Sequence, residues 1–205
     1  MSNFFLLRLR SFGARLYFRM LIAPHMRGTG PNTVFVRPRS LQNLGNIQTG
    51  RDVYVADGAL LAAVPHTASE RCELVIGNGC KLGAHNHIYA THSVVFEDAV
   101  LTAGNVYVSD NTHTYDRIDI PIMDQPVRQL SAVRIGRGSW LGQNVCVIGA
   151  SIGQGCVVGA NSVVLSDLPD FCVAVGAPAR IIRQLDSDSH LRDLVPAPDS
   201  VQKGN

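Results

Sequence analysis

Seven histidines are the side chains of this sequence best suited to moving a proton at neutral pH. A free imidazole is near half-titrated around pH 6.5, so it can accept a proton from a poor nucleophile such as an alcohol. His85 and His87 stand together in the run A-H-N-H, and His113 stands in T-H-T-Y. A histidine chosen from seven by type alone is more often a packing or surface residue than a catalyst. The structural elements that position these three side chains must therefore decide whether any of them is catalytic.

The cysteines offer a second kind of chemistry, as thiolates or as metal ligands. Their number is odd, their spacing is wide and no C-x-x-C pair occurs among Cys72, Cys80, Cys146, Cys156 and Cys172. Neither a disulfide framework nor a zinc site is indicated by this usage. A reducing, cytoplasmic setting fits it best.

The composition places these residues in a folded domain. Of the 205 residues 46% are hydrophobic and 17% are charged, which argues against a disordered chain and against a charged coiled coil. The length fits one domain with appendages. The net charge of +2 is far below what sequence-independent binding of nucleic acid requires.

The segment 1–30 predicts a basic amphipathic helix. Arginines interrupt each apolar run before it reaches the length of a membrane-spanning helix or of a signal-peptide core. On a helix Arg8, Arg15 and Arg19 share one face. The neighbouring apolar face is formed by Phe5, Leu9, Phe12, Leu16 and Met20. Such a helix either covers an open end of the main domain, which we favour, or adsorbs to an anionic membrane surface.

From residue 31 onward an aliphatic residue recurs every six positions. The clearest run consists of Ile135, Leu141, Val147, Ile152, Val158 and Val164. A looser run starts at Ile76 and continues at Val95 and Leu101, and a weak trace joins Leu41, Ile47 and Val53. A period of six fits neither a helix nor a long strand, so each unit must be a short strand followed by a turn.

Three such units would close a triangular coil of about 18 residues, and coils would stack at the strand spacing of about 4.8 Å. The residue after the aliphatic position is glycine at 77, 83, 136, 142, 153 and 159, where a corner needs positive φ or close backbone approach. Cys80 and Cys156 fall at inward positions, so we expect them to fill the core. The fold class predicted for residues 31–183 is all-β, a parallel β-helix.

Three segments break the period. VIGAS supplies five residues where six are expected and should shorten one corner between Val147 and Ile152. Residues 62–74 and 112–134 should leave the prism as loops, and the second is long enough to be functional. Residues 184–205 form a polar C-terminal tail.

Three motifs resemble the hexapeptide-repeat sugar O-acetyltransferases, such as the galactoside, maltose and polysaccharide O-acetyltransferases. They are VSDNTHTYD from Val108, IGRGSWLGQNVCVIGASIGQGCVVGANSVVLSDLP from Ile135, and VAVGAPARIIR from Val173. The resemblance covers about residues 76–183. It implies a left-handed hexapeptide-repeat prism, acetyl-CoA as acyl donor, no metal, and a homotrimer with the active site between neighbouring prisms.

The resemblance also implies catalytic roles. His113, at the root of the extended loop, matches the family histidine that acts as general base, which is worth roughly 10² to 10⁴ in rate. The hydroxyl would attack the thioester directly, without an acyl-enzyme. The backbone N–H of Gln143, just after the tryptophan corner, matches the donor to the developing oxyanion. The orienting partner of His113 stays open between Asp110, Asp116 and a backbone carbonyl.

Five residues match the coenzyme A site of the family. Trp140 resembles the aromatic residue that lines the approach of the acyl group, and Gly142 and Ala160 are small enough for the pantetheine arm to lie against the backbone. Arg180 and Arg183, in G-A-P-A-R-x-x-R, are candidates to bind phosphates. Where the family commonly has T-K-D, this chain has LSD at 165–167, which weakens a nucleotide phosphate contact there.

The acceptor is less defined. His87, with His85 beside it, takes the place of an acceptor-facing asparagine of the family, although a surface pair of histidines is nearly as good an interpretation. The family and the basic helix suggest a sugar hydroxyl in surface polysaccharide or lipid-linked oligosaccharide synthesis. The setting would be cytoplasmic, with peripheral contact at the inner face of the membrane.

Other functions remain open at this point. An N-acetyltransferase acting on an amino sugar and a serine O-acetyltransferase would have similar coenzyme sites. A γ-type carbonic anhydrase uses the same prism, and His87 and His92 resemble its closer zinc pair, but Arg51 stands where its third histidine would be. A non-catalytic solenoid scaffold would leave His113 and its loop without a role.

Overall fold

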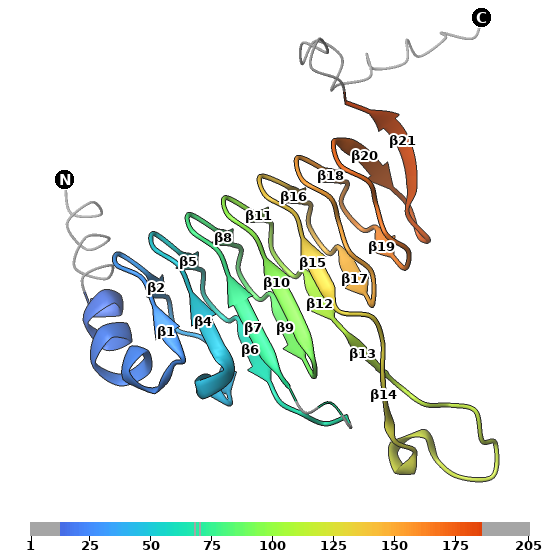
Figure 1. Cartoon of the computed structure of the whole chain (residues 1–205), viewed down its shortest axis with the longest axis horizontal. Coiled ribbons are helices and arrows are strands. Elements are labelled where there is room, and N and C mark those ends of the chain that lie inside the picture. The colour runs from blue at the N-terminus through green and yellow to red at the C-terminus, as the bar shows by residue number, and fades with distance from the viewer. Residues whose placement is uncertain (1–12, 68, 70, 186–205) are drawn as a thin grey trace, which may run out of the picture.

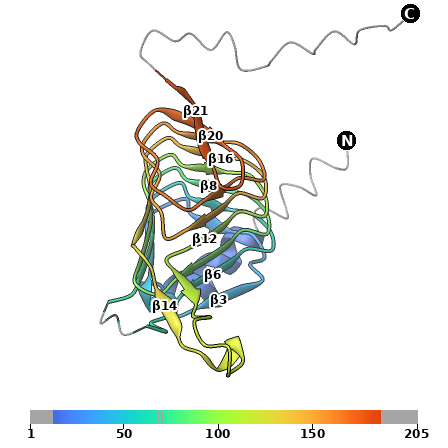
Figure 2. The ribbon, with the colours of Figure 1, turned by 90° about the vertical axis from the view of Figure 1, so that its right-hand side faces the viewer.

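The computed structural model describes residues 13–67, 69 and 71–185. The expectations on Phe5, Arg8, Leu9 and Phe12, and on the tail beyond residue 185, lie outside these residues. The described chain winds into a parallel β-helix whose coils stack along one axis (Figure 1). Seen from the end, the stacked coils enclose a common interior, and one hairpin projects from them (Figure 2).

Three sheets of parallel strands form the sides of the β-helix. The first sheet consists of β1 (Gly28–Thr29), β4 (Ile47–Thr49), β7 (Glu73–Ile76), β10 (Ser93–Phe96) and β15 (Val133–Ile135). The second consists of β2 (Val34–Phe35), β5 (Tyr54–Val55), β8 (Lys81–Leu82), β11 (Leu101–Thr102), β16 (Trp140–Leu141), β18 (Val157–Val158), β20 (Cys172–Val175) and the antiparallel β21 (Arg180–Gln184). The third consists of β3 (Ser40–Gln42), β6 (Leu60–Ala63), β9 (His87–Ala90), β12 (Tyr107–Ser109), β17 (Cys146–Ile148) and β19 (Val163–Val164).

The chain visits the three sides in a fixed order of first, second and third. In the last coils the first side continues only through the isolated bridges of Ile152 and Leu168. The prediction had coils of uniform length, whereas the observed coils differ in length. The chain takes a longer path from Glu73 to its strand partner Ser93 than from Trp140 to its strand partner Val157. The longer coils are extended at the corner between the third and first sheets. The shorter coil contains the VIGAS step.

The core consists of inward side chains stacked from coil to coil. All six positions of the clearest repeat are buried, as predicted, as are Cys80 and Cys156. The looser repeat was wrong by one residue around the fourth coil. Val95 is half-buried and Leu101 is exposed, while Phe96 and Thr102 point inward. The reason is the alternation along β10: Phe96 pairs with Ile76, so Val94 and Phe96 point inward and Val95 lies between them.

Close backbone approach explains the glycines that follow the aliphatic positions. A Cβ on Gly83 would lie 2.2 Å from the carbonyl oxygen of Ala103, and a Cβ on Gly136 would lie 2.4 Å from the backbone of Gln154. Neither glycine has positive φ. The sequence left two reasons open for glycine at these corners, positive φ and close backbone approach. Close approach of the next coil is therefore the reason.

Two excursions leave the β-helix at the same corner, between the third and first sheets. The first spans residues 64–72, which is shorter than the predicted loop 62–74 because β6 and β7 extend into it at both ends. The second begins at Asp110 and contains β13 (Asn111–His113), η4 (Ile122–Asp124) and β14 (Val127–Gln129) before β15 starts at Val133. The strands β13 and β14 pair as an antiparallel hairpin.

A helical segment covers the N-terminal end of the β-helix. Residues 13–17 are α-helical and continue into the π-helical turn η1 (Phe18–Ile22) and the 3-10 turn η2 (Ala23–His25), while η3 (Leu44–Asn46) is a separate 3-10 turn. Phe18 and Ile22 are buried, and the Phe18 ring centroid lies 4.8 Å from that of Phe35 in the first coil.

The predicted apolar face of this helix was wrong where the structure describes it. Leu16 and Met20 are exposed, because the open end of the coil accepts the stripe formed by Phe18, Ile22 and Met26 instead. No helix within residues 13–67, 69 and 71–185 is long and apolar enough to cross a membrane.

Candidate active site

A cleft of about 520 Å³ lies on the outer face of the third sheet, at the root of the hairpin. It brings together two of the predicted histidines from distant parts of the sequence, His87 of β9 and His113 of β13. Polar side chains from four further positions line it: Gln42, His66, Tyr89 and Tyr107. Its wall is completed by the hairpin through Asn111 and Val127.

His87 stands in the centre of the sheet. Its cross-strand neighbours are Leu60 of β6 and Tyr107 of β12, and the rings of His87 and Tyr107 meet edge to face with centroids 5.2 Å apart. Burial lowers the pKa of His87, and the positive charge of Arg39 lowers it further. A neutral His87 can accept a hydrogen bond from a hydroxyl at one ring nitrogen and donate one from the other.

His113 is held by the hairpin rather than by the sheet. It pairs with Val127 across β13 and β14, and its side chain is exposed. Within the described ranges its imidazole has no hydrogen-bond partner, so neither of the two aspartates considered from the sequence orients it. Asp116 instead forms an ion pair with Arg128 across the hairpin.

Asp110 holds the root of the hairpin. Its side chain is fully buried, and its carboxylate accepts hydrogen bonds from the backbone N–H groups of Thr91 at 2.8 Å, His92 at 2.7 Å and Ser93 at 2.8 Å. The Thr91 hydroxyl donates a further bond at 3.0 Å. These donors belong to the extended corner of the preceding coil, so the carboxylate fixes the point at which the chain leaves the β-helix.

Gln129 joins the two excursions. Its Oε1 accepts hydrogen bonds from the hydroxyls of Thr67 at 2.6 Å and Thr91 at 2.9 Å, and its Nε2 donates to the carbonyl oxygen of Asp110 at 2.8 Å. Thr67 lies in the first excursion and Gln129 in the hairpin. The hairpin that carries His113 is therefore tied to two earlier coils.

Several lining residues were missed by the sequence prediction. The Tyr89 hydroxyl and His66 Nδ1 share a hydrogen bond, and Tyr89 has a raised pKa, mainly because of burial. Alternation along β9 places His87 and Tyr89 on the same side, which the sequence could have indicated. The approach of Tyr107 and His66 depends on coil length and on the first excursion, for which the sequence has no local signal.

The residues predicted for the donor side lie elsewhere. Trp140 is 46% exposed on the second sheet, and its outward column continues through Val157 and Val173 to Arg183. Arg180 lies on the same terminal strand. None of Trp140, Gly142, Gln143, Ala160, Arg180 or Arg183 lines the cleft of His113 in the described part of one chain.

Two of these donor-side residues meet one another. A Cβ on Gly142 would lie 2.7 Å from the backbone nitrogen of Ala160, so small residues here mark a close contact between coils. Gln143 lies at the next corner, between the second and third sheets, and its carbonyl oxygen accepts a hydrogen bond from Asn161. In residues 13–67, 69 and 71–185 its backbone N–H has no acceptor.

His85 and His92 lie outside the cleft. His85 occupies a corner with φ of 58° and rests against Gly58, and it does not line the cleft although it is almost adjacent to His87 in sequence. His92 lies at the next corner, where Ser69 Oγ is 2.7 Å from its Nδ1. No group of three potential metal ligands occurs among the residues the structure describes.

Comparisons with known proteins agree with this architecture. A family model for the hexapeptide repeat of succinyl-transferase matches residues 132–166. WbbJ of Escherichia coli, named for O-acetyl transfer in lipopolysaccharide biosynthesis, is 33% identical over 161 residues, which cover 75% of this chain and 80% of WbbJ. The chain belongs to the hexapeptide-repeat O-acetyltransferase family. The family resemblance stated from the sequence is thus confirmed.

Further similar proteins differ from this chain in length or in sequence. A protein of Mycobacterium tuberculosis named as an acetyltransferase is 38% identical over 141 residues, 68% of this chain, and the chain spans only 45% of its length. A mutant of AntD, an N-acyltransferase of Bacillus cereus in complex with dTDP and coenzyme A, is 20% identical, with a TM-score of 0.67 over 84% of this chain and 89% of AntD.

Galactoside acetyltransferase in complex with coenzyme A is 24% identical, with a TM-score of 0.57 over 91% of this chain and 84% of that enzyme. At such identities the two solved structures show the fold alone. Together with the parallel sheets, this similarity fits a left-handed β-helix.

Asp110→Asn should loosen the hairpin and destabilise the fold. The amide presents a donor to backbone N–H groups that need an acceptor, so we expect the free energy of unfolding to fall by about 1–3 kcal/mol. Denaturant unfolding measures the loss, and hydrogen exchange should show faster exchange in residues 111–129. Asp116→Asn, which breaks only the exposed pair with Arg128, is the control and should cost less than about 1 kcal/mol. Equal losses would contradict this role of Asp110.

The lowered pKa of His87 predicts a pH-dependent stability. The unfolded chain binds a proton at His87 near pH 6.5, while the folded chain resists protonation there until lower pH. The free energy of unfolding should therefore be highest above pH 6.5 and decrease as the pH falls through the window below it. His87→Gln should flatten this part of the profile. An NMR titration in which the His87 midpoint lies at or above 6.5 would contradict it.

Proposed function

We propose that this protein is an acetyl-CoA-dependent O-acetyltransferase that transfers an acetyl group to a hydroxyl of a sugar. One observation carries the proposal: in a chain of this family, the hairpin places His113 at the mouth of a cleft lined by His87 and two tyrosines. Imidazole and phenol groups around an open cleft suit an acceptor with several hydroxyls. Coenzyme A is bound in the galactoside acetyltransferase and AntD structures, which supports a coenzyme A thioester as donor.

In the proposed reaction His113 is the general base. Its imidazole takes the proton of the acceptor hydroxyl while the oxygen attacks the thioester carbon, and a tetrahedral intermediate forms. The backbone N–H of Gln143 stabilises the negative oxygen of that intermediate. When the intermediate collapses, the C–S bond breaks and the leaving thiolate takes the proton from the imidazolium. No acyl-enzyme forms.

The proposal requires more than one subunit, because His113 and Gln143 do not share a cleft within one chain. We propose a homotrimer in which Gln143 and the coenzyme site of one prism meet the His113 cleft of the next. An exposed column on the second sheet supports such contact. Its apolar members Tyr54, Leu101 and Trp140 are 41%, 47% and 46% exposed, and Lys81 stands between the first two. Exposed columns of this kind are typical of interfaces.

For coenzyme A we propose the second sheet as the binding face. Trp140 would lie beside the acyl and pantetheine end, and that arm would pass the corner where Gly142 is in close contact with Ala160. Arg183 ends the same outward column as Trp140, three strand spacings or about 14 Å away. Arg180 and Arg183 would bind the phosphates at that end.

For the acceptor we propose the cleft side chains, with His87 hydrogen-bonding a sugar hydroxyl. His85, which does not line the cleft, would not contribute in the same subunit. WbbJ is named for lipopolysaccharide biosynthesis, which favours a surface polysaccharide or lipid-linked oligosaccharide as acceptor. We propose a cytoplasmic enzyme with peripheral contact at the inner face of the membrane.

N-acetyl transfer to an amino sugar is the main alternative, since AntD is an N-acyltransferase of the same fold. Transfer to serine remains an alternative on the acceptor side. The geometry does not favour a carbonic anhydrase, because His92 is held at the corner after β9, whereas His87 lies on β9 and lines the cleft. A non-catalytic scaffold would leave the cleft without a role.

His113→Ala should lower acetyl transfer by at least about 10², the lower end for general base catalysis, while the protein stays folded and trimeric. Thiol release from acetyl-CoA measures the rate with sugar, amino-sugar and serine acceptors in parallel, and light scattering measures the assembly. His25→Ala, an exposed histidine outside the cleft, is the control. Near-full activity of His113→Ala would remove the base assignment, and transfer to amines alone would favour the N-acetyl alternative.

Arg180→Ala and Arg183→Ala should each raise the KM for acetyl-CoA more than the KM for the acceptor. The lost guanidinium would remove a charge-assisted hydrogen bond to a phosphate, worth a factor of roughly 10 in binding. Steady-state kinetics with each substrate varied in turn separates the two constants. Arg71→Ala, in the first excursion, should change neither constant. Equal effects on both constants would indicate structural damage instead.

A further inference from the structure

Positive charge is concentrated at the N-terminal end of the sequence. The first 51 residues contain eight of the 18 basic residues and none of the 16 acidic ones. Two of these arginines are paired with later acidic residues, Arg27 with Glu73 and Arg37 with Asp57. Arg15 and Arg19 form no ion pair within residues 13–67, 69 and 71–185.

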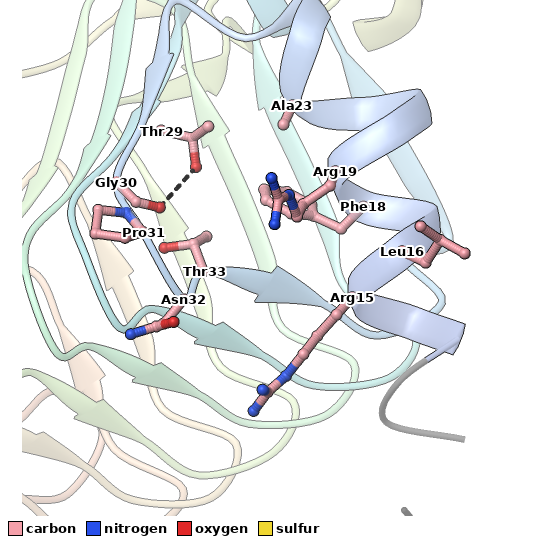
Figure 3. Close-up of a pocket in the computed structure, with 10 residues that line it drawn as sticks. All are labelled: Arg15, Leu16, Phe18, Arg19, Ala23, Thr29, Gly30, Pro31, Asn32 and Thr33. Atoms are coloured by element: carbon pink, nitrogen blue, oxygen red, sulfur yellow. Dashed lines mark hydrogen bonds between the residues drawn. The ribbon is translucent and has the colours of Figure 1, made fainter. Parts of the chain in front are cut away.

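Arg15 and Arg19 reach into a groove between the helical segment and the first corner of the β-helix (Figure 3). This arginine groove has a volume of about 560 Å³ and is closed on the far side by residues 29–33. The polar side chains opposite are already engaged, since Thr33 Oγ1 donates to the carbonyl oxygen of Gly50 and Asn32 Nδ2 donates to Asp52. The charged donors of the groove are the two guanidinium groups, which suit an oxyanion such as a phosphate.

The outer face of the same helical segment is apolar. Leu16, Tyr17, Met20 and Leu21 are 53%, 50%, 66% and 60% exposed. They lie on the side away from Phe18 and Ile22, which are buried against the first coil. This apolar ridge borders Arg15 and Arg19, and residues 13–26 contain no acidic side chain.

We propose that this end of the protein docks on a membrane that contains anionic phospholipid. The apolar ridge enters the boundary between headgroups and acyl chains, and a lipid phosphate binds between Arg15 and Arg19 in the arginine groove. Exposed apolar groups beside unpaired arginines are what an interfacial helix needs to bind such a surface. This proposal names the residues and the kind of lipid for the membrane contact that is part of the proposed function. It does not depend on acetyl transfer.

The location of the cleft agrees with this docking. Gln42 of β3 lines the cleft and belongs to the coil that the helical segment covers. His87 lies two strands further along the third sheet, at about 10 Å. An acceptor carried on a lipid would therefore lie close to His87 and the hairpin when the N-terminal end rests on the bilayer.

Co-sedimentation of the full chain with vesicles tests the proposal. Vesicles of phosphatidylcholine mixed with phosphatidylglycerol should bind the protein, and vesicles of phosphatidylcholine alone should bind it much less. Arg15→Gln with Arg19→Gln should weaken partitioning onto the mixed vesicles by roughly fivefold for each arginine, or about 25-fold together. Met20→Ser with Leu21→Ser should also weaken it, while the control Arg71→Gln with Arg137→Gln should not.

Equal binding to both kinds of vesicle, or wild-type binding by the Arg15 and Arg19 variant, would overturn the proposal. So would protection from thermal unfolding by inorganic phosphate that depends on the two arginines without any vesicle binding. A change of oligomeric state in the Met20 and Leu21 variant, again without vesicle binding, would identify the ridge as a protein interface. Thiol release with a soluble acceptor should be unchanged in all these variants, so a failure of docking and a failure of acetyl transfer are distinguishable.

Discussion

The structure depends on hydrogen bonding between successive coils. Each short strand has too few residues to be stable by itself, and it finds its backbone partners only in the strands of the coils above and below. The requirement holds the coils at the strand spacing, and the inward aliphatic side chains then stack into a continuous core. Corners cannot accept a Cβ where the next coil passes, as at Gly83 and Gly136. Variation is therefore confined to places where the chain leaves the stack.

Both excursions leave at the corner between the third and first sheets, and the candidate active site is built there. The corner at Thr91–Ser93 supplies three backbone N–H groups to the buried carboxylate of Asp110. Gln129 then links the hairpin to Thr67 of the earlier excursion. The stacked coils thus carry a projecting hairpin whose root consists of buried, hydrogen-bonded polar groups. The hairpin places His113 beside the face of the third sheet that carries His87.

The two outer faces have different characters, which explains why a single chain holds only half of the proposed site. The third sheet presents histidine and tyrosine side chains in a cleft, whereas the second presents the exposed apolar side chains of Tyr54, Leu101 and Trp140 in a column with Lys81. A flat side of a prism cannot enclose a substrate by itself. The neighbouring copy in the proposed trimer would close the cleft, and the covered N-terminal end would remain free for a membrane.

The sequence by itself determined the repeat, the inward positions of the run from Ile135 to Val164, the cysteines of the core, the excursion before Val133 and the family. Each of these follows from local spacing or from a contiguous motif. Only the tertiary structure decided the rest. Unequal coil lengths set which side chains meet across strands, and so brought Tyr107 beside His87. The corner that holds His85 against Gly58 kept it out of the cleft, and the open coil end selected Phe18 and Ile22 rather than Leu16 and Met20. These outcomes depend on contacts between residues far apart in the chain, which a six-residue period does not encode.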